Sequence, residues 1–430
     1  MFVGFSLCFM ITPFDRFVEF SVPQKSNYRC LELSPDGTML AAVSTNSVQI
    51  WSAQSEYVLL ASTPQNRPTG YSKALLNRVF VVWNDESDQI VVIRSEGVAD
   101  FYRIRQSRQS FNDAYEDLCL LQQYDKTRIE RICSIAIDQY GFPMSVCPLY
   151  QRILILNDSG NISELNWNGE VVGCPFTKFI PEQLAKSHPS LAGARPVFIA
   201  SCSDLSCLAL ALDTGDYLLL YIPPTSVLPT NATLIHPTLN DGIRQMAFAA
   251  GLPYLAIVSS RLSVEVFSIA VNIDASFASK SINVIDIRQY PQLVPSPLLV
   301  YDTITTIAWC PGQPIVALGL KYQGVMVWTI EGTILYSYNG YTPSLYNSAQ
   351  SKEESPMSAI DDSEIEMALE VSCCCFNMTG TSLLFNIPYD QVIHQNNHIF
   401  CRDSRLLCQR FCVFPDLIYA SYPAPRSTHS

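Results

Sequence analysis

The sequence has little charge and few basic residues. Only 15% of the 430 residues are charged, and 27 Lys and Arg stand against 39 Asp and Glu, which gives a net charge of −12. Nucleic-acid binding draws its affinity from clustered basic side chains, and the sequence holds no such cluster. The same shortage argues against direct electrostatic docking on an anionic membrane leaflet. We therefore expect no nucleic-acid partner, and only a peripheral membrane association that other proteins mediate.

The sequence also lacks a clear targeting or membrane segment. The apolar start "MFVGFSLCFMITPF" has no basic region before it, and at about 14 residues it is shorter than the roughly 20 that span a bilayer. The 15 cysteines contain no CxxC pair and suit a reducing compartment. We therefore expect a cytoplasmic protein. N-x-S/T triplets start at Asn157, Asn161, Asn231 and Asn377. A secreted protein is the alternative, and it predicts disulfides among the cysteines and glycan on Asn231 or Asn377.

Catalytic and cofactor motifs are absent as well. The sequence has no GxGxxG, GxxxxGK[ST], GxSxG or HExxH pattern. The nearest approach to a metal-ligand set is His394, His398 and Cys401, but "QNN" between the two histidines is typical of a hairpin turn rather than a zinc-binding helix. We assign no catalytic, cofactor-binding or metal residue. The sequence predicts a protein that is not an enzyme and needs no cofactor, and it identifies no partner-binding residue.

Alternating apolar stretches separated by turns dominate the sequence. In "TTIAWCPGQPIVALGLKYQGVMVW", residues 305–328, an apolar stretch meets a Pro-Gly turn, a second apolar stretch, a Gly-bearing turn, and a third stretch that ends on Trp328. The same order recurs at intervals of roughly 45 to 70 residues between closing aromatics, which is close to the spacing of propeller blades. The units that we identify are 31–51, 79–102, 134–167, 196–222, 246–267, 305–328 and 371–402.

Each unit is typical of a small antiparallel sheet with two apolar faces. A single sheet of this kind cannot bury both of its faces by itself. Radial stacking of such sheets buries both faces and leaves only short edges exposed. The predicted fold is all-β, a β-propeller of about seven WD40-like blades with short helical or loop insertions. We place the propeller at 31–412, an N-terminal apolar segment with a candidate closing strand at 1–30, and a tail at 413–430. A pair of β-sandwiches is the structural alternative.

Blade details follow from residue size. The small residues Ala41, Ala42, Ala317 and Gly319 suit the crowded inner part of a blade, and the closing aromatics suit the wider outer gaps; these are Trp51, Tyr102, Trp167, Tyr221, Phe267 and Trp328. No Trp is followed by Asp and no Gly-His pair occurs, so the hydrogen-bond network of standard WD40 repeats cannot form, and we expect packing to replace it. Alternation places Cys373 and Cys375 on one face of their strand and Cys374 on the other.

Three longer connections separate the units. Residues 105–131 predict an outer strand or a short helix, and residues 176–196 predict a helix followed by a loop. Residues 339–368 are Ser-rich and acidic and predict a solvated loop, and the overlapping residues 351–370 are a candidate short helix. On a propeller such connections are also where partners dock.

Several segments resemble the N-terminal propeller of the Ric family. The likeness rests on "GVMVWTIEGTILYSYNG" within residues 305–340 and on "LEVSCCCFNMTGTSLLF" after it. "LELSPDGTMLAAVSTNSVQIW" and "VVWNDESDQIVVIRSEGVADFY" are similar to the first two blades of that family, and "LILNDSGNISELNW" to part of the third. The start of the chain differs from the family, and the family continues into more propeller and a long helical region, so the resemblance implies an N-terminal piece or a truncated product.

The Ric family supplies the larger subunit of a two-subunit guanine-nucleotide exchange factor for a Golgi Rab GTPase. The resemblance therefore implies a scaffold subunit in retrograde endosome-to-Golgi transport, peripheral at the Golgi membrane. Its partners would be the second subunit of the complex and a Golgi Rab GTPase. Any exchange activity would belong to the complex. The alternative is a generic WD40-like propeller adaptor in another multiprotein assembly.

Overall fold

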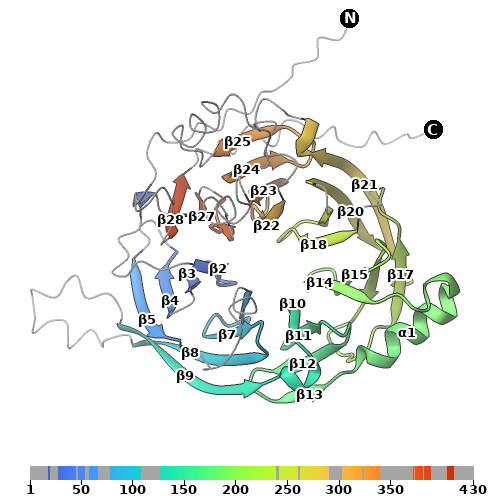
Figure 1. Cartoon of the computed structure of the whole chain (residues 1–430), viewed down its shortest axis with the longest axis horizontal. Coiled ribbons are helices and arrows are strands. Elements are labelled where there is room, and N and C mark those ends of the chain that lie inside the picture. Colours follow the sequence, from blue (N-terminus) through green and yellow to red (C-terminus); the bar gives the residue numbers. More distant parts are fainter. Residues whose placement is uncertain are drawn as a thin grey trace, which may run out of the picture.

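The computed structural model of the chain is a ring of sheets around a central axis (Figure 1). It describes residues 18–19, 28–44, 47–53, 58–65, 78–107, 126–238, 242–259, 262–289, 303–321, 324–338, 371, 373–380, 382–388 and 404–410. These residues form seven four-stranded antiparallel sheets, which we number as blades 1 to 7 in chain order. The prediction of a propeller of about seven blades is confirmed. The candidate loop and helix at 339–370 and the residues His394, His398 and Cys401 lie outside the described residues.

Within blades 1 to 6 the strands follow one another from the axis outward, and we name them a, b, c and d in that order. The first three blades contain β2 (Tyr28–Leu33), β3 (Met39–Ser44), β4 (Ser47–Ser52) and β5 (Leu59–Pro64); β6 (Val79–Trp83), β7 (Gln89–Arg94), β8 (Val98–Ser107) and β9 (Lys126–Ala136); and β10 (Pro143–Leu149), β11 (Arg152–Asn157), β12 (Ile162–Asn166) and β13 (Val171–Gly173).

Blades 4 to 6 repeat this order. They contain β14 (Pro196–Cys202), β15 (Cys207–Leu212), β16 (Tyr217–Tyr221) and β17 (Asn231–Ile235); β18 (Ile243–Phe248), β19 (Tyr254–Ser259), β20 (Ser263–Val271) and β21 (Phe277–Asp286); and β22 (Ile304–Trp309), β23 (Ile315–Leu320), β24 (Gly324–Thr329) and β25 (Ile334–Tyr338). Short 3₁₀ turns lie at Asp138–Tyr140, Pro189–Leu191 and Ile287–Gln289.

Blade 7 joins the two ends of the propeller. Its a, b and c strands are β26 (Cys374–Phe376), β27 (Ser382–Pro388) and β28 (Ser404–Arg410). Its outer strand is β1 (Val18–Glu19), which pairs with β28 through Val18 and Cys408. Because β1 precedes blade 1 in the sequence, this pairing closes the ring between the N-terminal and C-terminal strands.

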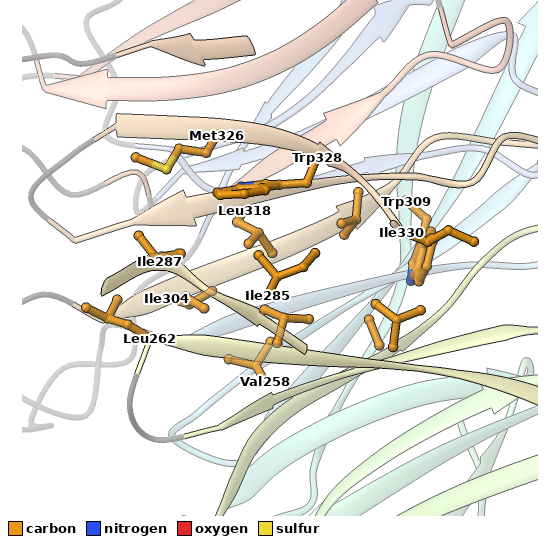
Figure 2. Packing of buried hydrophobic residues seen from close by; sticks show 14 of the residues in the cluster. Val258, Leu262, Ile285, Ile287, Ile304, Trp309, Leu318, Met326, Trp328 and Ile330 are labelled. Atoms are coloured by element: carbon orange, nitrogen blue, oxygen red, sulfur yellow. The ribbon is translucent and has the colours of Figure 1, made fainter. Parts of the chain in front are cut away.

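The core consists of seven apolar clusters, one between each pair of neighbouring blades. Figure 2 shows the cluster between blades 5 and 6, in which Val258 and Ile285 of blade 5 face Leu318 and Trp328 of blade 6. Alternate residues along one strand enter opposite clusters, as the two-residue period of a strand requires. Cys374 lies in the cluster between blades 6 and 7, whereas Cys373 lies in the one between blades 7 and 1, which confirms the predicted alternation.

The closing aromatics occupy equivalent positions in four blades. Trp51, Tyr102, Phe267 and Trp328 lie on c strands, are at most 3% exposed, and enter the cluster with the preceding blade. In blades 3 and 4 that position holds Leu165 and Leu220 instead. As in the other four blades, each pairs with the second residue of its b strand. Tyr221 is one residue further along and therefore packs toward blade 5. The closing aromatics predicted for units three and four were thus misplaced by one or two residues.

Two unit boundaries also differ from prediction. Residues 134–136 belong to β9, the outer strand of blade 2, and the a strand of blade 3 begins at Pro143. In the last unit, β28 lies just beyond the predicted end at residue 402. Residues 126–131 of the 105–131 connection form part of an outer strand, and the 176–196 connection forms α1 (Phe176–Ser187) and a loop, as predicted. Phe176, Ile180 and Leu184 face one side of α1 and pack on blades 3 and 4.

Buried hydrogen bonds supplement the packing in three blades, so the expectation that packing alone replaces the WD40 network was incomplete. Two residues before the closing aromatic stand Gln49, Asp100 and Glu265, all at most 3% exposed. Gln49 Oε1 accepts hydrogen bonds from Tyr28 Oη at 2.9 Å and Trp51 Nε1 at 3.1 Å. Glu265 accepts from the amide and hydroxyl of Thr238, which precedes blade 5.

In blade 2 the buried polar residue at this position is Asp100, and its partners are charged. One carboxylate oxygen lies 2.8 Å from Arg94 on the b strand, and the other lies 2.5 Å from Arg131 on the d strand. Arg94 is itself buried and also lies 3.5 Å from Glu96. Asp100 therefore joins three strands of blade 2 through charge-assisted hydrogen bonds.

We expect Asp100→Ala to reduce the free energy of unfolding by about 3–5 kcal/mol, because it leaves buried positive charge without its main partner. The measurement is urea unfolding followed by circular dichroism. Glu130→Gln is the matched control, since Glu130 also pairs with an arginine between β8 and β9 but is 47% exposed. The control should change stability by at most about 1 kcal/mol. Equal losses in the two variants would contradict the buried role of Asp100.

Candidate interaction surface

The turns between a and b strands lie around the axis on one face of the propeller, and contacts link them into a belt from blade 5 through blade 7 to blade 3. Starting at blade 5, the amide of Gly312 donates to Ala250 O, and Gly380 packs against Cys310 and Gln313. Blade 7 contacts blade 1 where Met378 covers Gly37, whose φ of +69° and lack of a side chain both suit that contact. A residue with a Cβ atom would collide there with Met378.

The belt continues through hydrogen bonds in blades 1 to 3. The amide of Asp36 donates to Ser87 Oγ at 3.2 Å, and Gln151 Nε2 donates to Asp85 Oδ2 at 3.2 Å. Turns that are 51 and 66 residues apart in sequence are therefore fixed relative to one another. A surface ordered in this way loses little conformational entropy when a partner docks on it.

Negative charge gathers on the belt. The described a–b turns hold Asp36, Asp85, Glu86, Asp88 and Asp204, and no Lys or Arg. Four of these five acidic residues lie on blades 1 and 2, which we call the acidic sector. The side chains of Asp36, Asp85, Glu86 and Asp204 are exposed. Partial burial of Asp36 is outweighed by hydrogen bonds from Ser34, Thr38 and Ser87, and its pKa is lowered, so it stays ionised at neutral pH.

One more carboxylate lies at the inner strand of blade 1. Glu32 reaches solvent, yet the surrounding protein removes part of the water that a carboxylate would bind, and this desolvation raises its pKa from 4.5 to about 7. Its negative charge in turn contributes to the raised pKa of the Cys30 and Cys375 thiols, although burial of those thiols is the larger cause. The carbonyl of Glu32 accepts a hydrogen bond from Trp83 Nε1 of blade 2 at 3.1 Å.

Exposed apolar side chains occupy a second part of the same face, at the c–d connections of blades 4 and 5. Val227, Leu228 and Val271 are 39–55% exposed, and Ile273 projects fully into solvent. Arg152 donates to the carbonyls of Ser226 and Val227, and Asn231 Nδ2 donates to Asp274 O. These bonds hold the first connection between blade 3 and the β20–β21 hairpin.

The acidic turn residues and the histidines of the described residues do not assemble into a catalytic site. Asp85 and Glu86 lie in a turn, and His236 pairs with Asp216 at 2.7 Å on the surface, far along the chain from His188. In the described part of the chain no three His, Cys, Asp or Glu side chains lie close enough to hold a metal ion. Eight cysteines are thiols outside any disulfide, namely Cys30, Cys133, Cys147, Cys202, Cys207, Cys310, Cys374 and Cys375. Within the described residues, no helix is both long and apolar enough to cross a membrane.

Comparison with known proteins supports the fold. No family model matches the sequence, and no curated protein matches it. Among solved structures, the RRP9 WD40 repeats match with a TM-score of 0.57 and 12% identity over 94% of this chain and 100% of that one. The β-propeller domain of Cps50 (Swd1) from Myceliophthora thermophila matches with a TM-score of 0.56 and 9% identity over 92% and 99%. Raptor from Chaetomium thermophilum matches with 0.56 and 11%, over 91% of this chain but 28% of that one.

These similarities define the class: the chain is a WD40-like β-propeller. At 9–12% identity they establish the fold and carry nothing further about activity or partners. Sequence reasoning missed the belt and the acidic sector as a site. The signal available was that the "SPDG" and "NDESD" turns both carry acidic residues at the same point of the repeat.

We expect Glu32→Gln to change how stability depends on pH. A carboxyl whose pKa is higher in the folded state contributes stability below its unfolded pKa, and that contribution is lost as the pH rises from about 4.5 to 7. The wild type should therefore lose stability relative to the variant when urea unfolding is compared at pH 5 and pH 8. Glu86→Gln, which removes an exposed carboxylate, is the control for loss of one charge. A difference between wild type and Glu32→Gln that is the same at both pH values would contradict the assignment.

Proposed function

We propose that this chain is a non-catalytic interaction platform, the propeller subunit of a guanine-nucleotide exchange factor complex for a Golgi Rab GTPase. The sequence resemblance to the Ric family supports the particular complex, and the quoted segments fall on strands of blades 1, 2, 3, 6 and 7. The propeller fold is compatible with this role and equally with the alternative, a generic propeller adaptor in another assembly.

The belt of a–b turns is the observation that carries the platform role. Both faces of every sheet are packed against neighbouring blades, so the sheet faces cannot meet a partner. The turns and connections are the parts of the fold that a partner can contact. On this face, contacts join the a–b turns across five blade junctions. Such a surface can hold a partner in one orientation.

The proposed mechanism involves no covalent step. The complex binds the GDP-loaded Rab, distorts its nucleotide pocket and stabilises the empty state until GTP enters. Within the complex this chain positions the second subunit and the GTPase, and it reaches the Golgi membrane peripherally through them. The acidic sector favours a partner surface that is rich in Lys or Arg, because opposite charge speeds association and fixes orientation.

The test is an affinity capture of the tagged chain from cells, with mass spectrometry of the bound proteins. We expect the second exchange-factor subunit and a Golgi Rab, with more Rab when nucleotide is removed with a chelator than when a GTP analogue is present. Recovery of other assembly proteins without either of these would contradict the exchange complex and favour the adaptor.

Two matched variants test the docking face. Glu86→Lys changes the charge of the acidic sector by two, and Glu182→Lys makes the same change on the exposed side of α1, which lies in a d–a connection at the opposite ends of the strands. We expect Glu86→Lys to reduce capture several-fold, since charges at an interface rim act mainly on the association rate. Glu182→Lys should leave capture unchanged. Equal capture by both variants would place docking elsewhere.

A further inference from the structure

Two cysteines face each other across the innermost hairpin of blade 4. Cys202 is the last residue of β14, Cys207 is the first residue of β15, and the two are direct partners in the strand register. Four residues, Ser203 to Ser206, form the turn between them. We propose that this pair is a site of reversible disulfide formation in response to a low-molecular-weight disulfide such as oxidised glutathione.

The backbone geometry suits the bond. Directly opposed residues of antiparallel strands have Cα atoms about 4.5 or 5.5 Å apart, and both separations lie within the roughly 4.4–6.8 Å of natural disulfides. Opposed residues also point to the same face of the sheet. Cys207 is fully buried in the cluster between blades 4 and 5, and Cys202 packs against that cluster while remaining partly exposed. Bond formation needs the Cβ atoms to approach by up to about 1 Å, at the end of a hairpin next to its turn.

The two thiols differ in a way that assigns their roles. Burial raises the pKa of both, and the effect is larger for Cys207. At Cys202 the Asp204 charge also raises the pKa, but the backbone amides of Leu205 and Asp204 donate hydrogen bonds to the sulfur and offset part of the burial effect. Cys202 is also the more accessible of the two. Cys202 is therefore the attacking thiol and Cys207 the resolving one.

The reaction proceeds in two exchanges. The Cys202 thiolate attacks one sulfur of oxidised glutathione, forms a mixed disulfide and releases one glutathione thiolate. The deprotonated Cys207 then attacks the Cys202 sulfur, forms the protein disulfide and releases the second glutathione thiolate. The protein loses two electrons and two protons, and oxidised glutathione is reduced to two glutathione thiols. Because the thiolates are the nucleophiles, the rate should rise with pH.

No other cysteines in the described strands are partners in register. The useful comparison is Cys310, which stands at the same point of the a–b turn in blade 6. Its amide donates to the carbonyl of Ile315, so the residue opposite it is an isoleucine. Cys310 thus supplies a matched buried cysteine that cannot form the bond.

The test uses the full chain, incubated with oxidised or reduced glutathione, alkylated with N-ethylmaleimide and digested without reduction. We expect mass spectrometry of the oxidised sample to find Cys202 and Cys207 joined, unalkylated and two hydrogens lighter, and reversal by dithiothreitol. Cys310→Ala should form the same bond. Recovery of both Cys202 and Cys207 as alkylated thiols after oxidation would overturn the proposal.

Single variants test the roles. Cys207→Ala should accumulate a glutathione adduct on Cys202, because the resolving thiol is gone. Cys202→Ala should leave Cys207 without an adduct, since the buried thiol is shielded from glutathione. An adduct on Cys207 at the level seen on Cys202 would overturn the assignment of attacking and resolving thiols. The wild-type measurement decides the disulfide itself even if a variant fails to fold.

Discussion

The structure depends on the burial of two apolar faces for every sheet. A four-stranded sheet whose residues are apolar at nearly every inner position has no face to offer to water, and the b strands of blades 1 to 6 are buried almost throughout. Only a closed ring gives each sheet two neighbours. The short pairing of β1 with β28 matters for the same reason, because it completes the sheet that lies between blades 6 and 1.

Closure also decides what the protein has left for function. Since the sheet faces pack against one another, the chemistry that can meet another molecule is confined to turns, connections and outer edges. The a–b turns are not independent loops in this molecule, because hydrogen bonds and side-chain contacts link them across most blade junctions. These links make the surface formed by the turns as rigid as the ring beneath it. The same surface has an acidic area on blades 1 and 2 and an exposed apolar area on blades 4 and 5. A surface of this kind can recognise a partner by shape and charge.

The sequence predicts the strands and the repeat well, because period-two alternation and turn residues are local properties. The prediction fails where the same local pattern fits two different positions in a blade. Residues 134–136 alternate like an inner strand yet extend β9, and the difference lies in which strand they pair with. Tyr221 follows the c-strand position by one residue, and that single step turns its ring toward blade 5. The belt could not be predicted at all, since its contacts join turns that meet only when neighbouring blades stack.

The buried polar residues show why a short stretch of sequence does not reveal every interaction that stabilises the blades. Asp100 and Glu265 look like surface residues in the sequence, because their partners Arg131 and Thr238 are about thirty residues away. An apolar pair of similar shape could stabilise a blade as well or better. The polar pair does something that apolar packing does not: any arrangement that separates Asp100 from Arg94 breaks a buried charge-assisted hydrogen bond, which a register of purely apolar contacts would not penalise. At the same c-strand position, blades 1, 2 and 5 carry Gln49, Asp100 and Glu265, and each of these residues bonds a different kind of partner. A shift in strand register would break these hydrogen bonds, so they favour the correct register in a ring of otherwise similar apolar sheets.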